Sequence, residues 1–158
     1  MVSYLNAKLS HDQCMVCGSR ENNPDSPELV FSQYPDGSVR APFVVSLKHQ
    51  GYTGLLHGGM ISTLLDAAMT HCLFMQGIKA LTAELTVRFI APVSVGQTIT
   101  ICASLLRQRR GVYELEAWLL SELYIAEDRP LARASAKFIV PSDENTVKIQ
   151  ITGMKHSF

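Results

Sequence analysis

Residues 57–75 read HGGMISTLLDAAMTHCLFM, and this stretch decides the fold of the chain. Nothing inside it breaks a helix, the pair Gly58-Gly59 opens it, and Gln76-Gly77 supplies a glycine stop. Apolar residues occupy most of its circumference, which is typical of a helix enclosed by the rest of a fold. We therefore predict one long central helix from about Gly58 to Met75.

One narrow polar stripe interrupts the apolar surface of this helix. Ser62, Asp66 and Thr70 repeat at positions i, i+4 and i+8, and Thr63 lies beside them. A carboxylate in the middle of a buried helix costs free energy unless it is hydrogen-bonded or used in chemistry. Asp66 is therefore the first candidate functional residue, and a purely structural role is the alternative.

Alternating apolar and polar residues predict strands on both sides of the helix. The expected strands are Glu28–Tyr34, Ser38–Ser46, Leu81–Phe89, Ile99–Leu105, Val112–Ala126, Ala132–Val140 and a short strand over Val147–Thr152. The turn Pro35-Asp36-Gly37 joins the first two, and short connections make successive strands antiparallel neighbours. Leu81–Phe89 reads as half-buried. The pattern predicts an α+β fold in which a curled antiparallel sheet of about six strands wraps around one long helix.

Length and composition narrow the function classes. A chain of 158 residues is expected to form one domain, and its 14 basic and 14 acidic side chains balance. This balance gives no reason to expect nucleic acid or a membrane as partner, and no apolar run approaches a membrane span. Two of the four cysteines, Cys72 and Cys102, fall in expected core elements, which favours a reducing compartment. We expect a cytoplasmic protein.

Cys14 and Cys17 have a spacing that also occurs in metal sites. His11 is a possible third ligand, but no second pair of cysteines or histidines of matching design follows. The sequence alone therefore predicts no metal site.

Four motifs carry a resemblance to a known family. They are Cys14–Gly18 (CMVCG), His49–Gly59 (HQGYTGLLHGG), Leu64-Leu65-Asp66 and Leu81–Pro92 (LTAELTVRFIAP). In this combination they resemble the hotdog-fold acyl-CoA thioesterases of the phenylacetyl-CoA (PaaI-like) type. The resemblance implies an N-terminal segment with a CxxC pair over residues 1–27, a hotdog thioesterase domain over 28–141 and a C-terminal tail over 142–158.

The resemblance also implies roles for individual residues. Asp66 matches the catalytic carboxylate, which acts in relatives as nucleophile or as general base for a water. The backbone N–H at Gly58 matches the group that binds the thioester oxygen, and Thr82 matches a hydroxyl that holds the water. Some relatives have an asparagine where this chain has Gly51, and the neighbouring Gln50 is a possible substitute.

The residues themselves support part of this assignment. Glycines at a helix N-terminus leave unpaired N–H groups open to a carbonyl oxygen, where the helix dipole favours negative charge. Gly58 and Asp66, however, lie about 12 Å apart along one helix, whereas one reacting carbon should lie roughly 3 Å from both groups. Two antiparallel copies of the helix solve this conflict. We therefore predict a homodimer with composite sites, and related thioesterases commonly associate further into tetramers.

The remaining candidates are assigned to substrate binding: His57, Gly59, Gln50, Gly51, Ser62, Arg109 and Arg110. His57 is expected to shape the junction between loop and helix, and the two arginines are candidates for contacts with coenzyme A phosphates. No cofactor is expected, because coenzyme A enters as part of the substrate. The alternatives are an acyl-thioester dehydratase that uses His49 or His57 and a non-catalytic acyl-CoA-binding domain.

Overall fold

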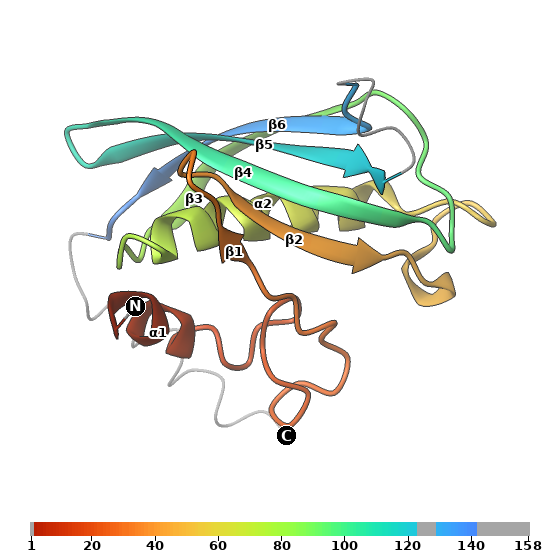
Figure 1. The fold of residues 1–158 in the computed structure, drawn as a ribbon, viewed down its shortest axis with the longest axis horizontal. Coiled ribbons are helices and arrows are strands. Elements are labelled where there is room, and N and C mark those ends of the chain that lie inside the picture. The colour runs from red at the N-terminus through yellow and green to blue at the C-terminus, as the bar shows by residue number, and fades with distance from the viewer. Residues whose placement is uncertain (1, 123–128, 142–158) are drawn as a thin grey trace.

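The computed structural model describes residues 2–122 and 129–141 (Figure 1). Its elements are α1 (Val2–Leu9), β1 (Ser32–Gln33), β2 (Val39–Val44), the short 3₁₀ helix η1 (Leu47–His49), α2 (Gly58–Phe74), β3 (Leu81–Phe89), β4 (Thr98–Arg109), β5 (Val112–Ser121) and β6 (Ala132–Ile139). The predicted central helix is confirmed, with its end one residue earlier than expected. The expected strand Val147–Thr152 and the tail over 142–158 lie outside the described residues.

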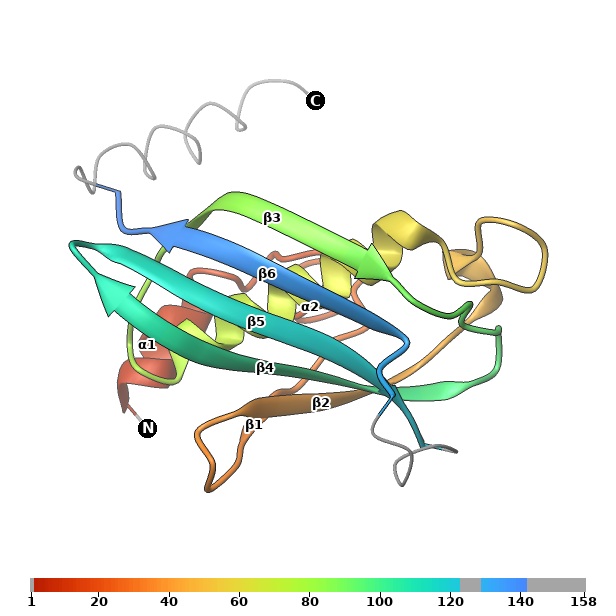
Figure 2. The same cartoon turned by 90° about the horizontal axis from the view of Figure 1, so that it is seen from above.

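The described strands form one antiparallel sheet in the order β1-β2-β4-β5-β6-β3. The sheet curves over one face of α2, and the N-terminal segment lies on the other side of the helix (Figures 1 and 2). This arrangement confirms the predicted α+β fold of about six antiparallel strands around one main helix. Among the described residues, no helix is long and apolar enough to cross a membrane.

The core forms where α2 meets the sheet. Leu64, Leu65, Met69 and Leu73 of α2 are almost fully buried. They pack with inward-facing side chains of the sheet, which alternate along β5 and β6 as the sequence pattern predicts. Burying each such leucine contributes about 1.5–3 kcal/mol, so this helix is fixed to the sheet along most of its length.

The N-terminal segment differs from the expectation. A helix, α1, forms where no periodic pattern was found, and Glu28–Phe31 do not belong to a strand because β1 contains only Ser32–Gln33. The hydroxyl of Tyr4 lies 3.2 Å from Nδ1 of His71, and the ring of Phe31 stacks on the same imidazole at 4.5 Å. Burial lowers the pKa of His71 to about 4, so this side chain is a neutral part of the packing.

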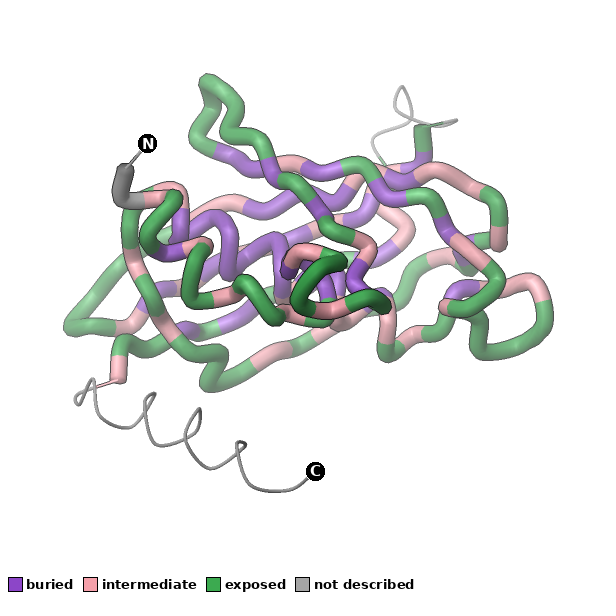
Figure 3. The backbone as a smooth tube through the Cα atoms, turned by 90° about the horizontal axis from the view of Figure 1, so that it is seen from below, coloured by how far each residue is buried: buried purple, intermediate pink, exposed green. Residues whose placement is uncertain are grey.

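Strand β3 also differs from the expectation. It pairs with β6 and not with β4, so it forms one edge of the sheet. The strand is mostly exposed in the single chain rather than half-buried, with Leu81 47% and Phe89 55% exposed. Figure 3 shows the contrast between β3 and the buried α2. An edge strand with exposed apolar side chains is a surface on which a second chain can pair.

Candidate active site

A groove of about 900 Å³ lies at the N-terminus of α2. We call it the Gly58 groove. Its walls come from the loop before α2 and from the end of β3 with the residues after it. The residues that line it are Gln50, Gly51, Tyr52, Leu55, Leu56, His57, Gly58, Ile61, Phe89, Ile90, Ala91, Pro92 and Val93. Most of these side chains are apolar. The structure thus brings four of the predicted site residues, Gln50, Gly51, His57 and Gly58, into one place.

Local hydrogen bonds fix the loop that forms one wall of this groove. Oε1 of Gln50 accepts a hydrogen bond from the N–H of Gly54 at 3.0 Å, and the N–H of Gly51 donates to the carbonyl of Leu55 at 2.9 Å. A Cβ on Gly51 would lie 3.0 Å from Cδ2 of His57. A side chain at position 51 would therefore force the His57 ring to shift by a few tenths of an ångström.

His57 caps the helix. Its Nδ1 accepts a hydrogen bond from the N–H of Gly59 at 2.8 Å, so one of the unpaired groups at the helix start is satisfied. Through this contact His57 shapes the junction between loop and helix, and its contact with a substrate stays a prediction. Within the described residues, no group accepts a hydrogen bond from the N–H of Gly58, which remains available to a ligand.

A second cavity, of about 370 Å³, surrounds the carboxylate of Asp66. We call it the Asp66 pocket; it is lined by His11, Cys14, Met15, Val16, Cys17, Ser62, Thr63, Asp66, Ala67, Thr70, His71 and Leu85. Part of its wall comes from residues 11–17 of the N-terminal segment. The sequence carries no signal for that wall, because residues 1–27 show no period that would place them against α2.

Thr82 contacts Asp66 directly. Its hydroxyl donates a hydrogen bond of 2.6 Å to Oδ1 of Asp66. The pairing of β3 with β6 shifts between Thr82 and Glu84, which marks a β-bulge at Ala83. Because a bulge adds one residue to the strand, Thr82 and Leu85 both face α2 although simple alternation would separate them. The bulge thus aims the Thr82 hydroxyl at the carboxylate.

The environment of Asp66 favours a proton acceptor. Burial raises the pKa of the Asp66 carboxyl above its ordinary value, and the hydrogen bond from Thr82 opposes part of that shift. A carboxylate with a raised pKa is a stronger base than an exposed one, yet it is still ionised where its pKa lies below the ambient pH. The hydroxyl of Thr82 occupies one lone pair of Oδ1, and the second carboxylate oxygen remains for a water or a substrate.

The other polar side chains of α2 do not hydrogen-bond this carboxylate. Ser62 donates to the carbonyl of Gly58 at 3.1 Å, and Thr63 donates to the carbonyl of Gly59 at 2.9 Å. Thr70 donates to the backbone carbonyl of Asp66 at 3.0 Å. All three hydroxyls line the Asp66 pocket, so the polar stripe forms its floor. A substrate contact of Ser62 stays a prediction.

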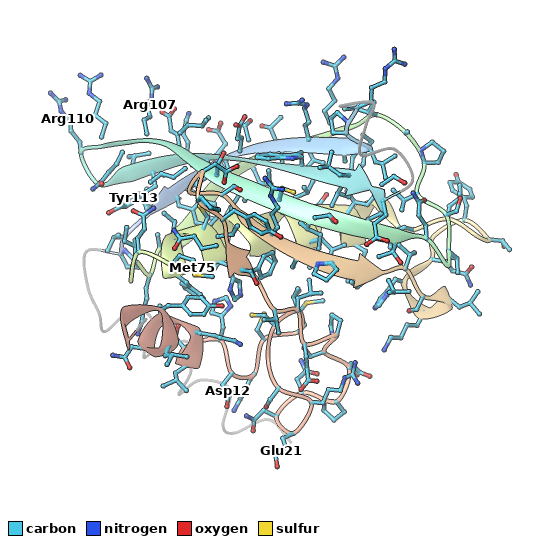
Figure 4. The ribbon with its side chains drawn as sticks, in the orientation of Figure 1. Asp12, Glu21, Met75, Arg107, Arg110 and Tyr113 are labelled. Carbon is cyan, nitrogen blue, oxygen red and sulfur yellow. The ribbon has the colours of Figure 1, made fainter. Side chains whose placement is uncertain are left out.

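Two predicted binding residues lie elsewhere. Arg109 is the last residue of β4 and Arg110 lies in the turn to β5, at the opposite end of the sheet from the loop before α2 (Figures 1 and 2). Figure 4 shows Arg107 and Arg110 on this hairpin, pointing away from α2. Neither arginine of the pair lines the Gly58 groove or the Asp66 pocket of the same chain. Their contact with coenzyme A phosphates stays a prediction.

The Gly58 groove and the Asp66 pocket are thus separate in one chain. No residue lines both, and their centres belong to different turns of α2. This separation agrees with the ~12 Å expected between Gly58 and Asp66 from helix geometry. A single reacting carbonyl cannot reach both groups of one helix.

Comparisons with known proteins concern mainly this central part of the chain. Residues 53–122 match the family model described as "Thioesterase superfamily". The chain is 30% identical over 66 residues to mouse (Mus musculus) acyl-coenzyme A thioesterase 13, which covers 40% of this chain and 47% of that protein. It is 34% identical over 62 residues to the acyl-coenzyme A thioesterase PaaI of Escherichia coli (strain K12), which covers 38% of this chain and 44% of that protein. The chain spans about half the length of the curated relatives it matches.

Solved structures extend the likeness beyond the matched segment. The structure of the E. coli PaaI protein from the phenylacetic acid degradation operon aligns with a TM-score of 0.69 and 18% identity, over 87% of this chain and 95% of that chain. The smu.793 protein of Streptococcus mutans UA159 bound to acetyl CoA aligns with a TM-score of 0.64 and 21% identity, over 72% of this chain and 88% of that chain. At these identities the likeness shows the fold alone. The likeness confirms the predicted hotdog fold, and over its central part the chain is similar in sequence to the PaaI-like thioesterases.

Proposed function

We propose that this protein is an acyl-CoA thioesterase, which hydrolyses a coenzyme A thioester to a free carboxylic acid and coenzyme A. The observation that carries the proposal is the Asp66–Thr82 pair: a half-buried carboxylate, held by one hydroxyl and open to a cavity. The names of the matched relatives support the same substrate class. One structural neighbour was solved with acetyl CoA, which supports binding of the coenzyme A part.

The available N–H of Gly58 supplies the second half of the chemistry. It lies at the N-terminus of α2, where the helix dipole stabilises negative charge. A thioester oxygen in the Gly58 groove would accept this N–H and become more negative as the carbonyl carbon is attacked. A Cβ at this position would lie 3.4 Å from the ring of Phe89, so the glycine leaves the N–H open beside an apolar wall.

Asp66 activates the attacking group. As a general base it takes a proton from a water whose oxygen adds to the thioester carbon, and Thr82 orients the carboxylate. The tetrahedral intermediate then collapses, the bond between carbon and sulfur breaks, and the leaving thiolate takes the proton. Direct attack by the Asp66 carboxylate, followed by hydrolysis of the acyl-enzyme anhydride, is the alternative route. Neither route needs a cofactor, since coenzyme A is the leaving group of the substrate.

The two halves meet in a homodimer. The exposed edge strand β3 offers unpaired backbone groups and the apolar side chains of Leu81 and Phe89 to a second copy. Phe89 also lines the Gly58 groove, and Thr82 on the same strand contacts Asp66. Pairing two copies along β3 would therefore bring the Gly58 groove of one protomer toward the Asp66 pocket of its partner. Two such dimers can associate further into a tetramer.

The two alternatives receive less support from the contacts. A dehydratase needs a histidine that exchanges a proton with the substrate, and the helix cap engages Nδ1 of His57, which leaves only Nε2 for that role. His49 lies beside Ser46, with Nδ1 3.0 Å from the hydroxyl, and its ring packs against Phe43. A non-catalytic binding domain would gain nothing from a half-buried charge, whereas a hydrolase uses it.

Free thiol release from a panel of acyl-CoAs tests the proposal. The panel includes short, long and aromatic acyl groups, together with a 3-hydroxyacyl-CoA whose dehydration is followed by absorbance. We expect thiol release with at least one acyl group and no dehydration. Dehydration without thiol release would show a dehydratase. Tight acyl-CoA binding without turnover would show a binding domain.

A further inference from the structure

We propose that His11, Cys14 and Cys17 form a zinc site in the N-terminal segment, at the wall of the Asp66 pocket. One ligand atom from each of the three residues lies within 4.8 Å of the other two. The sequence predicted no metal here because no second pair of ligands follows. The fold supplies what the spacing could not show, because it places the imidazole of His11 beside both thiols.

The backbone around the thiols forms a tight turn. The N–H of Cys14 donates to the carbonyl of His11 at 2.9 Å, and the N–H of Gly18 donates to the carbonyl of Cys14 at 3.0 Å. The N–H of Val16 donates to Sγ of Cys14 at 3.4 Å, a contact that stabilises negative charge on sulfur. A Cβ on Gly18 would lie 2.6 Å from backbone atoms of Asp12 and Cys14, so only glycine fits. The two sulfurs are thus held together before any metal binds.

His11 is oriented toward the same point. Its Nδ1 lies 3.7 Å from Sγ of Cys17. Its ring meets the ring of Phe74 edge-on at 4.9 Å, which fixes the imidazole from the side of α2. Both thiols are free in the structure. A metal bound to all three residues would connect the loop after α1 to the packing of α2.

The donor set selects the metal. Two thiolate sulfurs and one imidazole nitrogen suit zinc, whereas magnesium and calcium prefer oxygen ligands. Three protein ligands leave a fourth position, and the same three residues line the Asp66 pocket, so water in this pocket can fill it. The two thiols lose their protons to solvent on binding, which makes zinc affinity rise with pH.

Metal content tests this inference on the full-length, reduced protein. We expect about one zinc per chain after dialysis against trace zinc, as measured by mass spectrometry of the metal. Cobalt added to the chelated protein should give a thiolate-to-cobalt charge-transfer band. Cys14→Ser and Cys17→Ser should lose stoichiometric zinc and weaken this band, and His11→Ala should lose stoichiometric zinc. Cys102→Ala, which removes a buried thiol on β4 outside the cluster, should keep both signals.

Thermal unfolding provides a readout that does not depend on the reaction. A chelator should lower the melting temperature of the wild-type protein, and added zinc should restore it, because a ligand that binds only the folded state stabilises it. The His11→Ala variant leaves both thiols in place, so it remains informative if a serine variant fails to fold. Less than stoichiometric zinc with no cobalt band in reduced wild-type protein would overturn the inference. Unchanged zinc content in Cys17→Ser would overturn it as well.

Discussion

Replacement of Asp66 by asparagine separates the chemical role of this residue from its structural one. Oδ1 of Asp66 accepts the 2.6 Å hydrogen bond from Thr82, and the amide oxygen of an asparagine can accept the same bond in the same volume. Only the negative charge and the second basic oxygen are lost. The fold should therefore survive, while the ability to take a proton from water disappears.

The expected loss follows from this role. A positioned general base contributes about 10²–10⁴ in rate, so turnover of a good acyl-CoA should fall at least ~100-fold, or about 2.7 kcal/mol in the activation free energy. Stability should not fall with it. Burial raises the pKa of Asp66 in the folded state, so the folded protein favours the protonated carboxyl. The free energy of unfolding therefore decreases as the pH rises through that pKa and the carboxyl ionises. Neutral asparagine avoids this loss.

The assay is free thiol release at saturating acyl-CoA, with chemical denaturation of the same samples. Asp36→Asn is the matched control, because it removes an exposed carboxylate between β1 and β2 that pairs with Arg40 at 3.2 Å outside both cavities. The control should turn over like the wild-type protein. Near wild-type turnover in Asp66→Asn would refute the reasoning and make Asp66 a structural residue.

Three further predictions follow from the same contacts. The kcat/KM should fall as the pH drops through the Asp66 pKa. Because burial raises this pKa, the fall should occur at a higher pH than for an ordinary carboxyl group. A fall at the ordinary carboxyl pKa would exclude Asp66 as its source. Thr82→Val should cost about 1–2 kcal/mol in turnover, the scale of one hydrogen bond, and a loss as large as that of Asp66→Asn would give Thr82 a direct chemical role. His57→Ala removes the helix cap and should lower the free energy of unfolding by about 0.5–2 kcal/mol in urea denaturation, whereas unchanged stability would show that the cap contributes nothing.

Periodicity predicts the centre of this fold well. The apolar run of α2 lies between clear stop signals, and β5 and β6 alternate regularly because one face of each packs on the helix. The periodicity of apolar residues indicates which face of an element is buried, and in β5 and β6 every second residue is buried. The position of β3 could not be predicted from such patterns, since its partner β6 comes from a distant part of the sequence.

The candidate site shows the same limit. Asp66 is conspicuous because a charge interrupts a buried helix, but alternation alone places Thr82 on the face opposite Leu85. The bulge at Ala83 reverses that placement, and a one-residue irregularity leaves no periodic signal. The wall formed by residues 11–17 is likewise invisible, since it depends on contacts between an irregular segment and α2.

Complementation between two inactive variants tests the composite site most directly. Asp66→Asn removes the base, and Gly58→Pro removes the donor N–H. Proline is tolerated at the first residue of a helix, and His57 before it already has the extended conformation that proline requires. Each variant alone should be inactive as a homodimer.

Mixed dimers show whether the Gly58 and Asp66 of one active site come from the same protomer or from two protomers. If the site joins Gly58 of one protomer to Asp66 of its partner, each mixed dimer contains one site with both groups intact, and thiol release should return when the two inactive proteins exchange chains. Subunit exchange is confirmed by mass spectrometry of tagged chains. Mixed dimers that remain inactive, or an active monomer, would contradict the composite site.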